Sequence, residues 1–154
     1  MDIELRDFTK NDIAIYEQLH KEINASQYMS RAYPKDYGKE NSEYYFKAIL
    51  LNNHFIGIIY FEPDFDQQKS YYLGIMIGRN KLFGKGIGKL AIKKGIELLQ
   101  KETVVETVKL NVRANNERAV NCYKNFGFKT TQTYYKTADS NNIKCYSMKY
   151  EIKN

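Results

Sequence analysis

The sequence predicts one mixed α/β domain, residues 1–154, with a mostly antiparallel sheet. Three observations predict this class: consecutive strand-like runs with short connections in residues 44–78, glycines at 84–88 that lead into a helical pattern, and a strand, a helix and a hairpin after residue 106. The composition agrees with a folded globular chain, because 43% of its residues are hydrophobic and 27% are charged.

The N-terminal segment predicts a strand and then a helix. Residues 3–8 alternate between apolar and polar side chains, and a helical pattern then runs from a cap at Thr9 or Asn11 to Ile23. We expect a short helix and a loop in the polar segment 24–42. Its tyrosines either line a substrate entrance or, as we favour, pack in the core: Tyr28, Tyr33 and Tyr37.

Three apolar runs follow and predict an antiparallel meander. The first two, 44–51 and 54–62, meet at Asn52 and Asn53, residues that accept the positive φ of a tight hairpin turn. The third run covers residues 70–78 after a polar loop. Strands at this spacing pair with their sequence neighbours, so we expect them side by side in the sheet.

The remaining residues predict two helices and three strands. A helical pattern covers 86–101, a strand covers 107–112, and a second helix covers 115–127. The last two strands, 128–136 and 143–152, form a closing hairpin.

Charge is distributed unevenly along the chain, which has a net charge of +6. Residues 1–66 carry 12 acidic and 7 basic side chains, whereas residues 67–154 carry 6 acidic and 17 basic ones. The basic half suits an anionic partner and the acidic half a cationic one, or both simply solvate the surface.

Several classes of protein are disfavoured. No apolar run approaches the ~20 residues of a membrane span, and the acidic N-terminus is unlike a targeting signal. Cys122 and Cys145 lack disulfide or metal-ligand spacing, and with only two histidines we expect no metal. These features predict a cytoplasmic protein with reduced thiols.

The segment Leu82 to Gln100, LFGKGIGKLAIKKGIELLQ, predicts a phosphate-binding helix start. Unpaired N–H groups and the positive end of the helix dipole attract phosphate there, and glycines allow close approach. A P-loop is disfavoured because Gly86 stands where Ser or Thr would hold magnesium. A dinucleotide fingerprint is disfavoured because the third glycine is missing from its place, and kinase motifs are absent.

Two motifs instead resemble the Gcn5-related N-acetyltransferase (GNAT) family. Phe83 to Gly88, FGKGIG, resembles the [QR]-x-x-G-x-[GA] segment that cradles the pyrophosphate of acetyl-coenzyme A, with Phe83 in place of Gln or Arg. LNVRANNERAVNCYKNFGF, residues 110–128, resembles the second cofactor segment, N-x-x-A-x-x-x-Y-x-x-x-G-F. It matches at every defined position: Asn116, Ala119, Tyr123, Gly127 and Phe128.

The resemblance implies a GNAT-like sheet of about seven strands, flanked by helices, with a splayed strand pair that holds acetyl-coenzyme A. Backbone groups near Met76 and Ile77 would bind the pantetheine arm, and Tyr123 would be the general acid that protonates the leaving sulfur. The general base stays open among Tyr72, Glu62, Asp64 and a water relay. The implied cofactor-binding residues are Met76, Ile77, Phe83, Gly84, Lys85, Gly86, Ile87, Gly88, Lys89, Asn116, Ala119 and Tyr123.

The implied reaction is direct attack of a primary amine on acetyl-coenzyme A in a ternary complex. The acidic N-terminal half favours a small cationic acceptor, such as a polyamine, an amino sugar or an aminoglycoside. The alternatives are a protein N-terminus, an aminoacyl-tRNA, or a protein that binds coenzyme A or nucleic acid without catalysis. Dimers are common in the family, so a homodimer is compatible with the resemblance.

Overall fold

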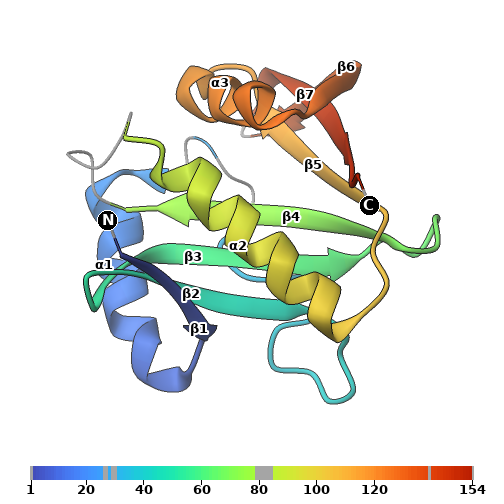
Figure 1. Ribbon diagram of the computed structural model, residues 1–154. Helices are drawn as coiled ribbons and strands as arrows, with labels where there is room; N and C mark the ends of the chain where they lie inside the picture. Colours follow the sequence, from blue (N-terminus) through green and yellow to red (C-terminus); the bar gives the residue numbers. More distant parts are fainter. Residues whose placement is uncertain (1, 26–27, 29–30, 79–84, 139, 154) are drawn as a thin grey trace.

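The computed structural model describes residues 2–25, 28, 31–78, 85–138 and 140–153, which form a seven-stranded sheet with helices on both faces (Figure 1). Among the described helices, none is long and apolar enough to cross a bilayer. The elements are β1 (Ile3–Asp7), the 3₁₀ turn η1 (Lys10–Asp12), α1 (Ile13–Glu22), β2 (Tyr45–Leu51), β3 (His54–Pro63), β4 (Ser70–Ile77), α2 (Ile87–Glu102), β5 (Thr107–Arg113), α3 (Glu117–Phe126), β6 (Lys129–Ala138) and β7 (Asn141–Glu151).

The strand order β1-β2-β3-β4-β5-β7-β6 confirms the predicted mixed sheet. Every neighbouring pair is antiparallel except β4 and β5, which run parallel because α2 connects them as a crossover. The predicted meander is β2-β3-β4. In Figure 1, β5, β6 and β7 diverge from β4 together with α3.

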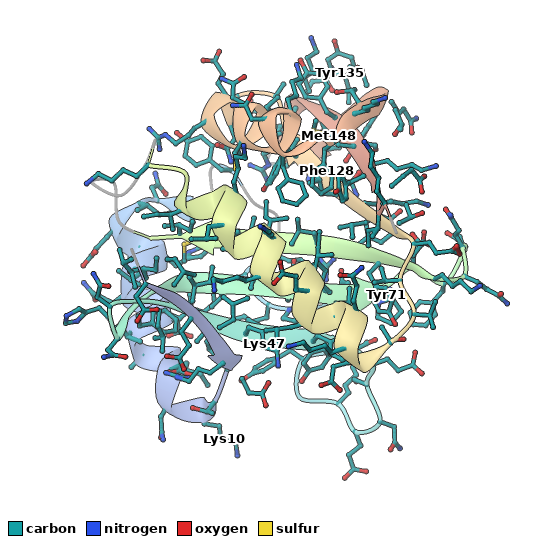
Figure 2. The ribbon with its side chains drawn as sticks, viewed as in Figure 1. Lys10, Lys47, Tyr71, Phe128, Tyr135 and Met148 are labelled. Atoms are coloured by element: carbon teal, nitrogen blue, oxygen red, sulfur yellow. The ribbon has the colours of Figure 1, made fainter. Side chains whose placement is uncertain are left out.

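Each face of the sheet has its own core. The core on the α2 side joins α2 and α3 to the strands through side chains such as Ile92, Ile96, Val120 and Phe128. Figure 2 shows Phe128 and Met148 beneath α3, whereas Tyr135, which is 61% exposed, projects from the end of the hairpin. The opposite core packs α1 against an aromatic cluster whose described members all lie at or before Met76 in the sequence.

Two of the three predicted entrance tyrosines belong to that aromatic cluster. Tyr33 and Tyr37 stack at a centroid distance of 4.9 Å and meet Phe8 and Phe46 edge to face. Packing in the core, the favoured prediction, is therefore confirmed for them. Of the short helix expected in 24–42, Ala25 has 3₁₀ conformation, and its carbonyl accepts from the N–H of Tyr28 at 2.9 Å. Residues 31–42 form turns and bends with local backbone hydrogen bonds, as expected for a loop.

The hairpin prediction at Asn52 and Asn53 is confirmed by their φ angles of 49° and 69°, values that asparagine tolerates better than most residues. The closing hairpin is tighter than expected, because β6 extends to Ala138 and β7 begins at Asn141.

The first helix is preceded by a 3₁₀ turn: Asp12 accepts from the backbone N–H of Thr9 at 2.8 Å, and α1 then begins at Ile13.

Candidate functional site

The parallel pair β4–β5 is joined only where the two strands begin. Its ladder comprises Ser70 with Thr107, Tyr71 with Val108, and Tyr72 with Lys109. Beyond Tyr72 the strands separate, although β4 continues to Ile77 and β5 to Arg113. This is the splayed strand pair that the family resemblance implied.

The splay leaves backbone groups of β4 facing the gap. The N–H of Gly78 donates to Ile56 in β3 at 2.7 Å, so the even-numbered residues of β4 direct their backbone polar groups toward β3. The N–H and C=O groups of Ile75 and Ile77 therefore point toward β5, which the ladder no longer reaches. Of the two predicted residues, Ile77 presents its backbone to the gap, whereas the carbonyl of Met76 lies against Gly57 in β3.

A cleft of about 1330 Å³ passes through the splay. It is lined by β4 from Tyr72 to Ile77, by β5 from Asn111 to Arg113, by the first turns of α2 and α3, and by parts of β3, β6 and β7. Tyr28, the third predicted entrance tyrosine, also lines it. This volume exceeds the roughly 300–1,000 Å³ of ordinary small-molecule pockets, so the cleft has room for a large, extended ligand.

The start of α2 forms one end of the cleft. Gly86 caps the helix with φ +76°, a conformation that L side chains rarely adopt, and no side chain caps the helix. Hydrogen bonding within α2 begins when the N–H of Leu90 donates to Gly86 at 3.1 Å. The N–H groups of Ile87, Gly88 and Lys89 therefore have no acceptor within the helix, and all three residues line the cleft.

Gly88 also permits α2 and α3 to approach closely, because a Cβ there would lie 3.0 Å from the Sγ of Cys122. Two predicted cofactor residues, Phe83 and Gly84, lie outside the described residues. Lys85 is described and exposed, but it is not part of the cleft lining.

The start of α3 forms the adjoining wall. Asn116 caps this helix, since its side-chain oxygen accepts from the N–H of Ala119 at 3.4 Å. Both residues line the cleft, as the motif predicted. The asparagine therefore fixes the helix start, and its amide nitrogen is the group left for a ligand.

Tyr123 lies one turn further along α3 and lines the cleft with only 8% of its surface exposed. Its ring meets Phe128 edge to face at a centroid distance of 5.8 Å. Burial, and to a lesser extent the neighbouring Cys122 and Tyr60, raise the pKa of the Tyr123 phenol far above its ordinary value. The hydroxyl therefore keeps its proton throughout the physiological pH range.

Glu62, a predicted candidate for the general base, lines the cleft but is fully engaged. Both of its oxygens accept from the guanidinium of Arg31, one of them at 3.1 Å, and the backbone N–H of Lys35 donates to it at 2.9 Å. Both oxygens of this carboxylate therefore already accept hydrogen bonds within the protein.

Asp64 is not part of the cleft lining. It accepts from Lys109 at 2.7 Å, from Ser70 at 3.1 Å and from the N–H of Asp66 at 3.0 Å. Burial alone would raise the pKa of Asp64, but these bonds outweigh it and lower the pKa. Tyr72, the remaining candidate, lines the cleft, with the Nζ of Lys109 6.0 Å from its ring centre.

A family model described as the acetyltransferase (GNAT) family matches residues 9–128. The chain belongs to this family. Solved structures share the fold: a GNAT acetyltransferase from Streptococcus pneumoniae is 19% identical, with a TM-score of 0.74 over 99% of this chain and 100% of the other. Spermidine N-acetyltransferase from Vibrio cholerae, in complex with coenzyme A and spermine, is 16% identical, with a TM-score of 0.79 over 97% and 95%.

A third solved structure has a TM-score of 0.82 at 13% identity, over 98% of this chain and 95% of the other. It is an acetyltransferase from Salmonella typhimurium that modifies the N-terminal serine of a ribosomal subunit protein. A comparison with curated protein sequences finds no match.

The sequence motifs missed the side of this GNAT cleft that faces away from α2. It includes Arg31, Tyr60, Tyr134, Lys136 and Cys145, which come from distant parts of the chain. Tyr60 had one indirect signal: Gly74 is its partner across β3 and β4, and a Cβ on Gly74 would lie 2.1 Å from the tyrosine ring. The glycine thus makes room for a ring in the cleft wall.

Proposed function

We propose that this GNAT protein transfers the acetyl group of acetyl-coenzyme A to a primary amine by direct attack in a ternary complex. One observation carries the proposal: the cleft joins the start of α2, whose first N–H groups have no acceptor within the helix, to the buried Tyr123 through a gap between β4 and β5. Diphosphate suits the helix start, and an extended amide-bearing arm suits the open ladder groups of Ile75 and Ile77. Neighbours of the same fold were solved with coenzyme A.

The proposed chemistry needs a proton at the leaving sulfur. When the amine nitrogen attacks the thioester carbonyl, the C–S bond breaks and the electron pair passes to sulfur, where the phenol of Tyr123 donates its proton. The resulting tyrosinate is unfavourable in its buried position, so it recovers a proton from the newly acylated, strongly acidic nitrogen. Because its pKa is raised, the phenol of Tyr123 is protonated before each turnover.

Among the described residues, no unengaged carboxylate lines the cleft near Tyr123. Glu62 is held by Arg31, and Glu117 lies in the first turn of α3. We therefore propose that the amine loses its proton to water before or during entry, rather than to a side-chain base. The pH dependence of the reaction tests this step.

We expect kcat/KM to rise about tenfold per pH unit until the pH reaches the pKa of the acceptor amine. This pKa is ~10 for an alkyl amine and ~8 for a peptide α-amine. Because the pKa of Tyr123 is raised, we expect no second, falling limb of the pH profile at any pH up to about 10. The measurement is the pH profile of thiol release with both kinds of acceptor. A rising limb at one pH for both acceptors would instead identify a base on the enzyme.

Coenzyme A binding can be measured apart from turnover through Cys122, which is half-buried in the cleft wall beside Gly88. Burial raises the pKa of this thiol, an effect that Lys89 partly offsets, so alkylation is best followed near pH 8.5. We expect saturating coenzyme A to slow alkylation of Cys122 about tenfold, as read by mass spectrometry of the Cys122 peptide. An unchanged rate, together with no heat of binding in calorimetry, would contradict the proposed cofactor site.

Two kinds of acceptor amine have support. The acidic N-terminal half and the neighbours that acetylate spermidine favour a cationic small amine, which was the sequence prediction. The neighbour that modifies an N-terminal serine favours a peptide N-terminus.

A further inference from the structure

Tyr60 is a buried phenol in the cleft wall that the proposed proton transfers do not use. It belongs to β3, is 6% exposed and lines the cleft. Among the residues that the structure describes, none forms a hydrogen bond with its hydroxyl. Arg31, whose charge acts on this phenol, directs its guanidinium to Glu62 instead. A buried hydroxyl in this position costs free energy unless water or a ligand in the cleft bonds to it.

The hydroxyl of Tyr60 lies at the edge of the splay. Tyr60 and Gly74 are partners across β3 and β4, and β4 forms one side of the gap (Figure 1). A Cβ on Gly74 would lie 2.1 Å from the Cζ of the tyrosine ring and 2.6 Å from its hydroxyl oxygen. The tip of the ring therefore rests on Gly74, so the side chain extends from β3 across β4 toward the gap.

A backbone N–H lies beside this hydroxyl. Ile75 follows Gly74 in the chain, and its N–H points toward β5, which the β4–β5 ladder no longer reaches at this level. Gly74 is thus adjacent to two hydrogen-bond donors, one from the backbone of β4 and one from the side chain of Tyr60. Two donors beside one place in a cleft are the arrangement that stabilises negative charge on a carbonyl oxygen.

The order of groups along the cleft places a thioester at these donors. A Cβ on Gly88 would lie 3.9 Å from the Cδ1 of Ile77, so the start of α2 lies beside the end of β4. An arm that leaves a diphosphate there passes Ile77 and then Ile75 as it runs toward the closed end of the splay. Tyr60 and Tyr123 also face the same part of the cleft, since Tyr60 contributes to the raised pKa of Tyr123.

The phenol of Tyr60 suits a hydrogen-bond donor better than a base. Burial raises the pKa of Tyr60, an effect that Arg31 partly offsets. The hydroxyl therefore keeps its proton at physiological pH and can share it with an oxygen, whereas a neutral phenol does not remove a proton from an amine.

We propose that Tyr60 is a further catalytic residue, whose hydroxyl donates a hydrogen bond to the thioester carbonyl oxygen beside the N–H of Ile75. When the amine nitrogen bonds to the carbonyl carbon, the π electrons of the carbonyl move to this oxygen, and the two donors stabilise its negative charge. The C=O bond re-forms as the C–S bond breaks, and the electron pair on sulfur takes its proton from Tyr123. Tyr60 keeps its own proton throughout. This role rests on the proposed acetyl transfer.

Tyr60→Phe removes the hydroxyl and retains the ring against Gly74. We expect it to lower kcat about 10²-fold, the usual cost of losing one donor of this kind. The KM for the amine and the protection of Cys122 by coenzyme A should change little, and the loss should be the same for every amine and for hydrolysis by water. A raised KM for the amine with unchanged hydrolysis would show that Tyr60 only binds the acceptor, and would overturn the proposed role.

The carbonyl stretch of bound acetyl-coenzyme A reports the hydrogen bond directly. With a carbon-13 label in the acetyl carbonyl and no acceptor present, infrared difference spectroscopy should place this band at a higher wavenumber in Tyr60→Phe than in the wild type. The reason is that a hydrogen bond to the oxygen weakens the C=O bond. Tyr123→Phe should leave the band unchanged. Identical bands in the wild type and Tyr60→Phe would contradict a bond from Tyr60 to this oxygen.

The matched control is Tyr37→Phe. Both tyrosines meet Phe46 edge to face, Tyr60 at a centroid distance of 6.1 Å and Tyr37 at 5.4 Å, but Tyr37 is not part of the cleft lining. This variant should turn over like the wild type. An equal loss in both variants would overturn the role of Tyr60, because the hydroxyls would then act through the fold. Failure of coenzyme A to bind, or no turnover of any amine by the wild type, would instead overturn the proposed function itself.

Discussion

Tyr123→Phe is expected to lower turnover about 10²-fold or more while acetyl-coenzyme A still binds. The change removes the one hydroxyl that α3 places in the proposed reaction centre, and the leaving thiolate then departs without a proton donor. The ring contact with Phe128 is retained, so the fold and the cleft walls are preserved. Steady-state thiol release measures the loss, and protection of Cys122 from alkylation measures cofactor binding in the same preparation.

The matched control is Tyr150→Phe. Tyr150 packs against Phe126 and Phe128 at centroid distances of 4.9 and 5.4 Å, but it is not part of the cleft lining. The Tyr150→Phe variant therefore loses a hydroxyl beside the same aromatic residues, Phe126 and Phe128, but loses no proton donor in the cleft. Undiminished turnover in Tyr123→Phe, or an equal loss in the control, would remove Tyr123 from its proposed role.

The sequence could predict the parts of the site that depend on local backbone chemistry. Asn116 caps a helix, Gly86 takes a positive φ, and Asn52 and Asn53 make a tight turn because each conformation suits that residue type within a few positions of chain. The order of these elements then determined which strands became neighbours. The two helix starts in the cleft wall were therefore predictable, and the family resemblance added the expectation that they bind a cofactor.

The side of the cleft that faces away from α2 was not predictable in the same way. Glu62 is held by Arg31, which is 31 residues away, and Lys109 by Asp64, which is 45 residues away. Neither pair leaves a local pattern in the sequence, because the two partners of each pair come from distant parts of the chain. The net charge of the N-terminal half could not replace this information, because most of its acidic residues are exposed and lie outside the cleft lining.

Asp64→Asn is expected to destabilise the protein by roughly 2 to 3 kcal/mol, because it leaves the ammonium of Lys109 without its partner in a largely buried position. The side chain of Asp64 is 2% exposed and that of Lys109 25%, so water replaces the lost interaction only in part. The pair also anchors the closed end of the splay, since Ser70 and Lys109 both belong to the short β4–β5 ladder. We therefore expect the KM for acetyl-coenzyme A to rise several-fold.

The pH dependence of this effect has a definite sign. The pKa of Asp64 is lowered in the folded state, so its contribution is fully present above the unfolded value of about 3.9 and is lost as the pH falls through the folded value. Chemical denaturation should thus show a large difference between wild type and Asp64→Asn near pH 7 that narrows toward pH 3. Asp66→Asn is the control, because Asp66 is exposed, donates its backbone N–H to Asp64, and acts on Lys109 only through weak long-range attraction. If both variants unfold at the same denaturant concentration, the Asp64–Lys109 pair does not hold the strands together, and the closed end of the splayed strand pair must be fixed by packing and the backbone ladder.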